Sequence, residues 1–178
     1  MPRRANEQTS LKPQDLFVLL ALVAQGDKAT GYIPLAAAAG MAVSAVHGSI
    51  KRSVLSGLAT LKGGKLTVLK GPTLDFLLHG AKYAFPPIWG PLDWGLPTGY
   101  AASPLKEIIE ASADPVPVWP HAEGSVRGMI LAPLFPTVPK AALANEKLYA
   151  LLALFDAVRA GRARERNAAA EILGGLLK

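Results

Sequence analysis

The chain of 178 residues contains no cysteine. Disulfide bonds and thiolate metal sites are therefore excluded, and a reducing cytoplasm is the compartment that we expect. Long hydrophobic runs are missing too. Although 51% of the residues are apolar and the mean hydropathy is +0.28, the longest uninterrupted run, residues 16–24, is nine residues long. A membrane-spanning helix needs roughly 18, so we expect no membrane segment.

Motifs that signal metal binding or catalysis are also lacking. The three histidines, His47, His79 and His121, lie too far apart in the sequence to form a ligand pair on one helix. The Gly-Lys pair at residues 64–65 does not form a phosphate loop, because Ala59 and Leu66 occupy positions that require Gly and Ser or Thr. We therefore expect neither a cofactor nor enzymatic activity.

Acidic residues are absent from one long stretch, between Asp27 and Asp75, which contains six lysines and arginines. Residues 1–85 carry ten basic and four acidic side chains, whereas residues 86–178 carry nine of each. The whole formal charge of +6 therefore resides in the first half of the chain. This distribution favours a polyanionic partner such as nucleic acid over an ordinary solvated basic face.

The same stretch carries a helix-turn-helix pattern. Pro13 is suited to a first helical turn, and the apolar pattern predicts a helix over residues 13–25. A second helix is expected over 33–39, ending at Gly40 in the left-handed conformation that glycine adopts at little cost. A third helix over 43–55 would bury Val46 and Ile50.

After the third helix, the spacing of apolar residues changes from a helical to an alternating pattern. Alternating side chains on either side of Gly63-Gly64 predict a hairpin with a basic tip formed by Lys62 and Lys65. We expect Gly71-Pro72 to separate the hairpin from a fourth helix. Thr73 should cap this helix, which is expected to reach Phe85.

The stretch IPLAAAAGMAVSAVHGSIKRSVLSGLATLKGGKLTVLKG, residues 33–71, resembles bacterial winged helix-turn-helix transcriptional regulators of the MarR-like and related kinds. The resemblance covers residues 11–85 and implies that the helix over 43–55 enters the major groove while the hairpin, the wing, contacts the DNA backbone. It assigns Val46, Ile50, Leu55 and Leu58 to the buried side. Ala42 stands where the pattern usually has a Ser or Thr cap.

By this resemblance, the residues expected to contact DNA are Ser44, Ala45, His47, Gly48, Lys51, Arg52, Lys62 and Lys65. We expect Lys51 and Arg52 to hold phosphates, because long basic side chains beside DNA usually position the protein without reading bases.

Residues 86–178 resemble no family that we recognise. Residues 86–104 are rich in Pro and Gly and predict an ordered loop, in which Trp89, Trp94 and Tyr100 could bind a protein partner or a small-molecule effector. Alternating side chains predict a hairpin from 116–119 and 126–131, with a short helix over 106–111 before it. Two helices, the first capped by Asn145 and interrupted at Gly161, finish the chain.

The sequence thus predicts an α+β fold with two parts: a winged helix-turn-helix domain over 11–85, and a smaller module over 86–178 with a hairpin and two C-terminal helices. The expected function is sequence-specific binding of double-stranded DNA by a homodimeric regulator, with residues 148–177 or the first helix as candidate interface. Two alternatives remain open: an adaptor or antitoxin-like accessory subunit that holds a protein partner, and an RNA-binding factor.

Overall fold

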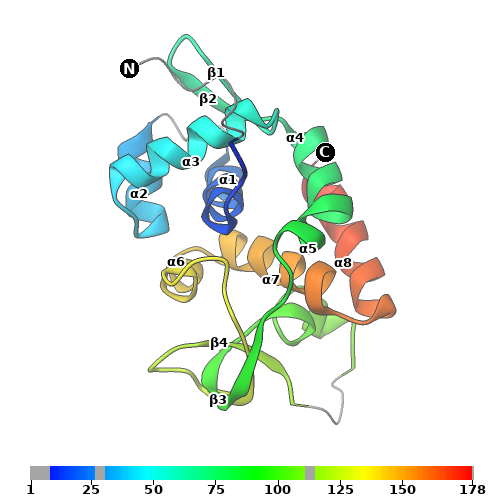
Figure 1. Cartoon of the computed structure of the whole chain (residues 1–178). Coiled ribbons are helices and arrows are strands. Elements are labelled where there is room, and N and C mark those ends of the chain that lie inside the picture. The colour runs from blue at the N-terminus through cyan, green and yellow to red at the C-terminus, as the bar shows by residue number, and fades with distance from the viewer. Residues whose placement is uncertain (1–8, 27–30, 111–114, 178) are drawn as a thin grey trace.

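The computed structural model describes residues 9–26, 31–110 and 115–177. The fold is α+β (Figure 1). In order, the elements are α1 (Pro13–Gln25), α2 (Tyr32–Ala39), α3 (Val43–Leu55), β1 (Ala59–Lys62), β2 (Lys65–Val68), α4 (Lys70–Asp75), the π-helical turn η2 (Phe76–Gly80), α5 (Ala81–Ala84), β3 (Trp89–Pro97), the 3-10 turns η3 (Gly99–Ala101) and η4 (Leu105–Glu107), β4 (Pro117–Pro120), β5 (Val126–Leu131), α6 (Val138–Ala144), α7 (Glu146–Ala160) and α8 (Ala163–Leu176).

Helices α2 and α3 meet at a sharp turn, with 105° between them. Gly40 takes the predicted left-handed conformation there, at φ 61° and ψ 37°. The turn is held from outside by Thr137, whose hydroxyl donates a hydrogen bond to the carbonyl oxygen of Ala39 at 2.6 Å. A side chain at position 40 would also meet Thr137, at 3.4 Å. The bend is therefore fixed both by backbone geometry and by the segment that leads into α6.

Strands β1 and β2 form the predicted hairpin, with Lys62 directly opposite Lys65. Gly63 and Gly64 make the two-residue turn, and both have positive φ (55° and 77°), which two-residue hairpin turns of this kind require.

The fourth helical segment begins earlier than predicted, at Lys70 instead of Thr73, and runs through α4, η2 and α5 to Ala84. Gly71-Pro72 does not interrupt the helix, because a proline in the first turn lacks only an N–H that would have no helical partner. Thr73 is not a cap; its buried hydroxyl donates to the carbonyl oxygen of Leu58 at 3.2 Å.

The C-terminal strands differ from the prediction. Residues 86–104 do not form only a loop, because they contain β3, which pairs antiparallel with both β4 and β5. The predicted hairpin of β4 and β5 is wrong, since these two strands run parallel. Each of the three strands therefore pairs with the other two, and the small sheet closes on itself. The short helix expected at 106–111 is the single turn η4.

Helix α7 occupies the middle of the molecule, between α1 and the closed sheet (Figure 1). Asn145 caps it as predicted, accepting a hydrogen bond from the Leu148 N–H at 3.0 Å. One hydrophobic cluster joins α1, α3, α7 and α8, so the predicted boundary at residue 86 does not separate two cores. Because the apolar faces of α1 and α7 are buried within this cluster, they are not free to form a dimer interface.

Within the described residues no single helix is long and apolar enough to cross a membrane. Only the bent pair of α2 and α3 meets the length and composition criteria when its two members are taken together.

Candidate nucleic-acid interface

Helix α3 has one buried and one exposed side. Its buried residues are Val46, Ser49, Ile50 and Ser53. Of the predicted contact residues, Ser44, His47 and Lys51 are exposed, and Ala45 and Gly48 are partly exposed. The predicted burial of Val46, Ile50 and Leu58 is confirmed, but that of Leu55 is wrong, because its side chain is 58% exposed. The exposed side of α3 is thus open to a partner along its length.

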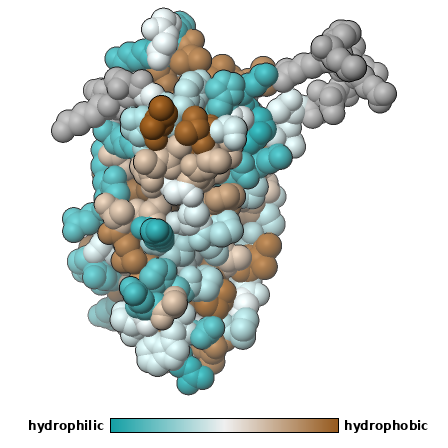
Figure 2. Space-filling view, turned by 90° about the vertical axis from the view of Figure 1, so that its left-hand side faces the viewer, coloured by the Kyte–Doolittle hydropathy of each residue, from teal (hydrophilic) through white to brown (hydrophobic). Residues whose placement is uncertain are grey.

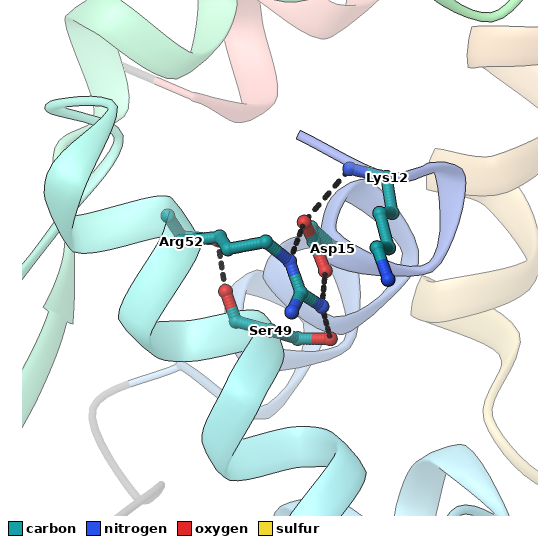
Figure 3. A network of polar contacts seen from close by, with 5 residues as sticks. Lys12, Asp15, Ser49 and Arg52 are labelled. Carbon is teal, nitrogen blue, oxygen red and sulfur yellow. Dashed lines mark hydrogen bonds and ion pairs between the residues drawn. The ribbon is translucent and has the colours of Figure 1, made fainter. Parts of the chain in front are cut away.

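Arg52 does not face outward with the other predicted contact residues. Its Nε and Nη2 donate to Asp15 Oδ2 and Oδ1 at 2.7 and 2.6 Å, and Nη2 also donates to Ser49 Oγ at 3.3 Å (Figure 3). The Lys12 backbone N–H completes the network, donating to Asp15 Oδ2 at 2.8 Å. Asp15 is fully buried and Arg52 only 18% exposed. The fork therefore joins α1 to α3, which corrects the prediction that Arg52 holds a phosphate.

The electrostatics of this fork are consistent with a structural role. The hydrogen bond to Asp15, together with the attraction of its carboxylate, raises the pKa of Arg52 above its already high ordinary value, against the opposing effect of burial. The Arg52 guanidinium therefore stays charged at neutral pH. It offsets the buried negative charge of Asp15, so that charge does not repel an anion at the exposed side of α3.

His47 is supported by a neighbouring aromatic ring. Its imidazole lies 5.0 Å from the ring of Tyr32, between centroids, at an angle of 47°. The pair links the first turn of α2 to the middle of α3. This contact restricts the orientation of His47, one of the exposed polar side chains that could reach a base edge.

The hairpin has a polar and an apolar face. Residues directly opposite on antiparallel strands point to the same side, so Thr60, Lys62, Lys65 and Thr67 share one face. Leu66, on the other face, is buried. Two lysines directly opposite each other repel. Lys62 and Lys65 therefore place two positive charges on one face of an exposed tip.

No carboxylate side chain lies within the described residues 31–74, which include α2, α3 and the hairpin. The exposed cations of this segment are Lys51, Lys62, Lys65 and Lys70. This segment therefore contributes positive charge and no carboxylate of its own.

The same part of the molecule also exposes apolar side chains. Ile33 is 73% exposed on α2, Val43 and Leu55 are exposed at the two ends of α3, and Leu61 is exposed on β1. On the side of the molecule that carries α2, strongly hydrophobic residues lie close together above a paler apolar area, with hydrophilic residues around them (Figure 2). This surface therefore combines apolar side chains with polar and charged groups.

The aromatic residues of the C-terminal half do not form one surface. Trp89 and Tyr100 border one hollow, whereas Trp94 borders another together with His121. Trp119 is buried, and its indole Nε1 donates to Asp156 Oδ2 at 2.7 Å.

Asp156 is the centre of a buried polar network that sequence reasoning missed. Its carboxylate also accepts from Thr98 Oγ1 and from Arg159 Nε, each at 2.7 Å. One sequence signal could have revealed this network: Asp156 is a single acidic residue within the apolar stripe of a core helix, and an arginine follows it at i+3. The network fastens α7 to the closed sheet and leaves no free carboxylate for chemistry.

No group of three or more potential metal ligands occurs in the part of the chain that the structure describes. Comparison of the chain with protein-family models, curated proteins and solved structures gives no match.

Proposed function

We propose that the chain binds double-stranded DNA as a winged helix-turn-helix regulator of transcription in the bacterial cytoplasm. The observation that carries this proposal is the exposed side of α3 beside a lysine-tipped hairpin, in a segment whose described residues 31–74 contain no carboxylate. A helix of this diameter fits the major groove, and the hairpin is placed to contact the adjoining backbone.

The exposed residues divide by chemistry. Ser44, Ala45 and His47 belong to the first half of α3, the part of a recognition helix that faces base edges. Gly48 has no side chain, so it allows the backbone to approach the groove closely. Lys51, Lys62 and Lys65 are exposed cations suited to phosphate oxygens.

Sequence specificity favours a homodimer, since two recognition helices double the contacted sequence. Neither α1 nor α7 can provide the interface, because both are buried in the core of one chain. A second copy would have to use another surface, such as α8 (Ala163–Leu176), the remaining part of the predicted region 148–177.

Charge reversal tests the proposal. Lys51→Glu and the double variant Lys62→Glu with Lys65→Glu should each weaken binding of a labelled duplex at least tenfold, measured by fluorescence anisotropy with a duplex selected from a random pool. Lys106→Glu is the matched control, because Lys106 is an exposed lysine outside the α2–β2 segment. Equal affinity of all variants would remove α3 and the hairpin from the interface, provided that their circular dichroism spectra match the parent.

Salt dependence gives a second readout. The logarithm of the binding constant should fall with the logarithm of salt concentration by about 0.9 per phosphate contacted. The hairpin double variant should therefore have a slope shallower by about 1.8 if each lysine holds one phosphate.

A protein-binding adaptor is the second candidate, and the exposed Ile33, Val43, Leu55 and Leu61 favour it. An apolar protein interface responds weakly to salt, whereas the DNA complex should respond steeply. Substituting Leu55 by Ser should abolish capture of a protein partner and leave the salt slope for DNA unchanged.

A further inference from the structure

A hollow far along the chain from α3 has the composition of a small-molecule site. We call it the aromatic hollow; its bordering residues include Trp89, Tyr100, Pro117, Met129, Arg162 and Glu165. These residues come from β3, η3, β4, β5 and the start of α8. Its volume is about 390 Å³, within the range of ligand pockets.

The walls are apolar and flat. Trp89 remains 47% exposed although it lies on a paired strand, and the other apolar or aromatic lining residues include Tyr100, Pro117 and Met129. Indole and phenol rings present negative faces to a ligand, and these attract cations. A smaller cavity of about 30 Å³ shares Trp89, Tyr100 and Pro117 with the hollow and is also bordered by Asp156.

Glu165 supplies a negative charge inside this lining. One carboxylate oxygen, Oε2, accepts a hydrogen bond from the backbone N–H of Arg162 at 2.8 Å. The other, Oε1, has no hydrogen-bond partner among the described residues. Gly161 permits the close seating of Glu165, because a Cβ at position 161 would lie 2.8 Å from its Oε2. The carboxylate is thus held at a fixed place with one oxygen left for a ligand.

Arg162 also borders the hollow, so both charge signs are present. Its side chain is exposed to solvent, whereas that of Glu165 is partly buried. Because water and salt screen an exposed charge more than a partly buried one, the negative charge of Glu165 and the aromatic faces dominate inside the hollow.

Buried hydrogen bonds connect several of the elements that border the hollow. The Asp156 network holds Thr98, Trp119 and Arg159, and thereby fixes β3, β4 and α7 relative to one another. A ligand would meet walls already in place and would not have to order them.

We propose that the aromatic hollow binds a small organic amine, with its flat apolar body between Trp89, Tyr100 and Met129 and its ammonium group on Glu165. This site is independent of the DNA-binding proposal, since it shares no residue with α3 or the hairpin.

The test is calorimetric titration of the whole chain with two ligands that share a phenylethyl body, phenethylamine and 3-phenylpropionate. Phenethylamine should bind with one site per chain, and the acid at least tenfold more weakly. Comparable or tighter binding of the acid would overturn the proposal, because it would mean that Arg162, and not Glu165, selects the charge of the ligand. Absence of saturable amine binding would also overturn it.

Two variants locate the site. Glu165→Gln keeps the carbonyl oxygen that accepts the Arg162 N–H but removes the charge, so it should preserve the fold and lower amine affinity about tenfold. Trp89→Ala should lower it by at least as much, whereas Trp94→Ala, an exposed tryptophan on the same strand outside the hollow, should not. Unchanged amine affinity in both Glu165→Gln and Trp89→Ala would overturn the proposal.

Discussion

Arg52 pairs with a buried carboxylate in the structure, whereas it was predicted to contact a phosphate. A basic side chain on a recognition helix suggests a phosphate contact, and nothing local to α3 distinguishes Arg52 from Lys51. The difference lies 37 positions away, at Asp15, whose buried carboxylate receives both arms of the guanidinium fork. An arginine suits this bidentate geometry better than a lysine does.

Removing that fork should destabilise the fold. In Arg52→Ala the buried carboxylate of Asp15 keeps only the Lys12 N–H among these donors, so we expect a loss of about 3 kcal/mol in the free energy of unfolding, measured by urea denaturation. Lys51→Ala, one position earlier and exposed, should change it by less than about 0.5 kcal/mol. Equal effects of the two substitutions would show that the fork contributes nothing specific.

Tyr149 links stability to alkaline pH. Its hydroxyl donates to the carbonyl oxygen of Pro97 at 2.7 Å, and burial raises the pKa of Tyr149 above its ordinary value. A raised pKa in the folded chain means that this stabilisation is present below the unfolded pKa, near 10, and is lost as pH rises through the folded value.

Tyr149→Phe should therefore be less stable than the parent by about 1 kcal/mol at pH 8, because it lacks the hydrogen bond. The deficit should shrink above about pH 10. There the phenol of Tyr149 ionises in the unfolded parent chain but is held neutral by burial in the folded one, so the unfolded state of the parent is favoured. Urea denaturation of both proteins from pH 8 to 11 measures it. A deficit that stays constant to pH 11 would argue against the assigned pKa shift.

At the scale of elements, α3 begins without a side-chain cap. Ala42 has the extended backbone of an N-cap residue, φ −64° and ψ 142°, but no side-chain oxygen to accept the free N–H groups of the first turn. The helix that we propose enters the groove thus has no side-chain acceptor for the free N–H groups of its first turn.

Ala42→Ser should supply the missing acceptor and raise the free energy of unfolding by about 1 kcal/mol, measured by chemical denaturation. Ala37→Ser is the control: within α2 the same change meets helical backbone, where serine is less favourable than alanine by up to about 0.7 kcal/mol. Stabilisation by both substitutions, or by neither, would contradict a capping effect.

Local signals made α1 and α3 predictable. The bounds of α1 and α3 were predicted as 13–25 and 43–55 and are confirmed, because proline, glycine and apolar spacing act within a few residues. The β1–β2 hairpin was predictable for the same reason, since a glycine pair determines its turn.

The closed sheet was not predictable from local signals. Gly90, Pro91, Gly95 and Pro97 make β3 look like a loop, yet its partners β4 and β5 lie more than twenty residues away and decide its conformation. Gly95 is required by that pairing, because a side chain there would lie 2.1 Å from the carbonyl oxygen of Trp119. In such a strand, glycine marks a close approach of two backbones.

Considered as a whole, the molecule has one core organised around α7, with the proposed DNA-binding elements at one end and the closed sheet at the other (Figure 1). The predicted boundary at residue 86 followed the end of the resemblance over 11–85 and the start of the Pro- and Gly-rich residues 86–104. Hydrophobic packing does not follow this division, because α1 of the first half buries its apolar residues in the cluster that contains α7.

The most direct test of the central claim is to map where a DNA duplex touches the chain. In NMR titration of the isotopically labelled protein with a selected duplex, amide signals of residues 43–51 and 60–67 should shift, while those of β3, β4 and β5 should stay in place. Shifts confined to the closed sheet, or no shift with any duplex at low salt, would contradict the account.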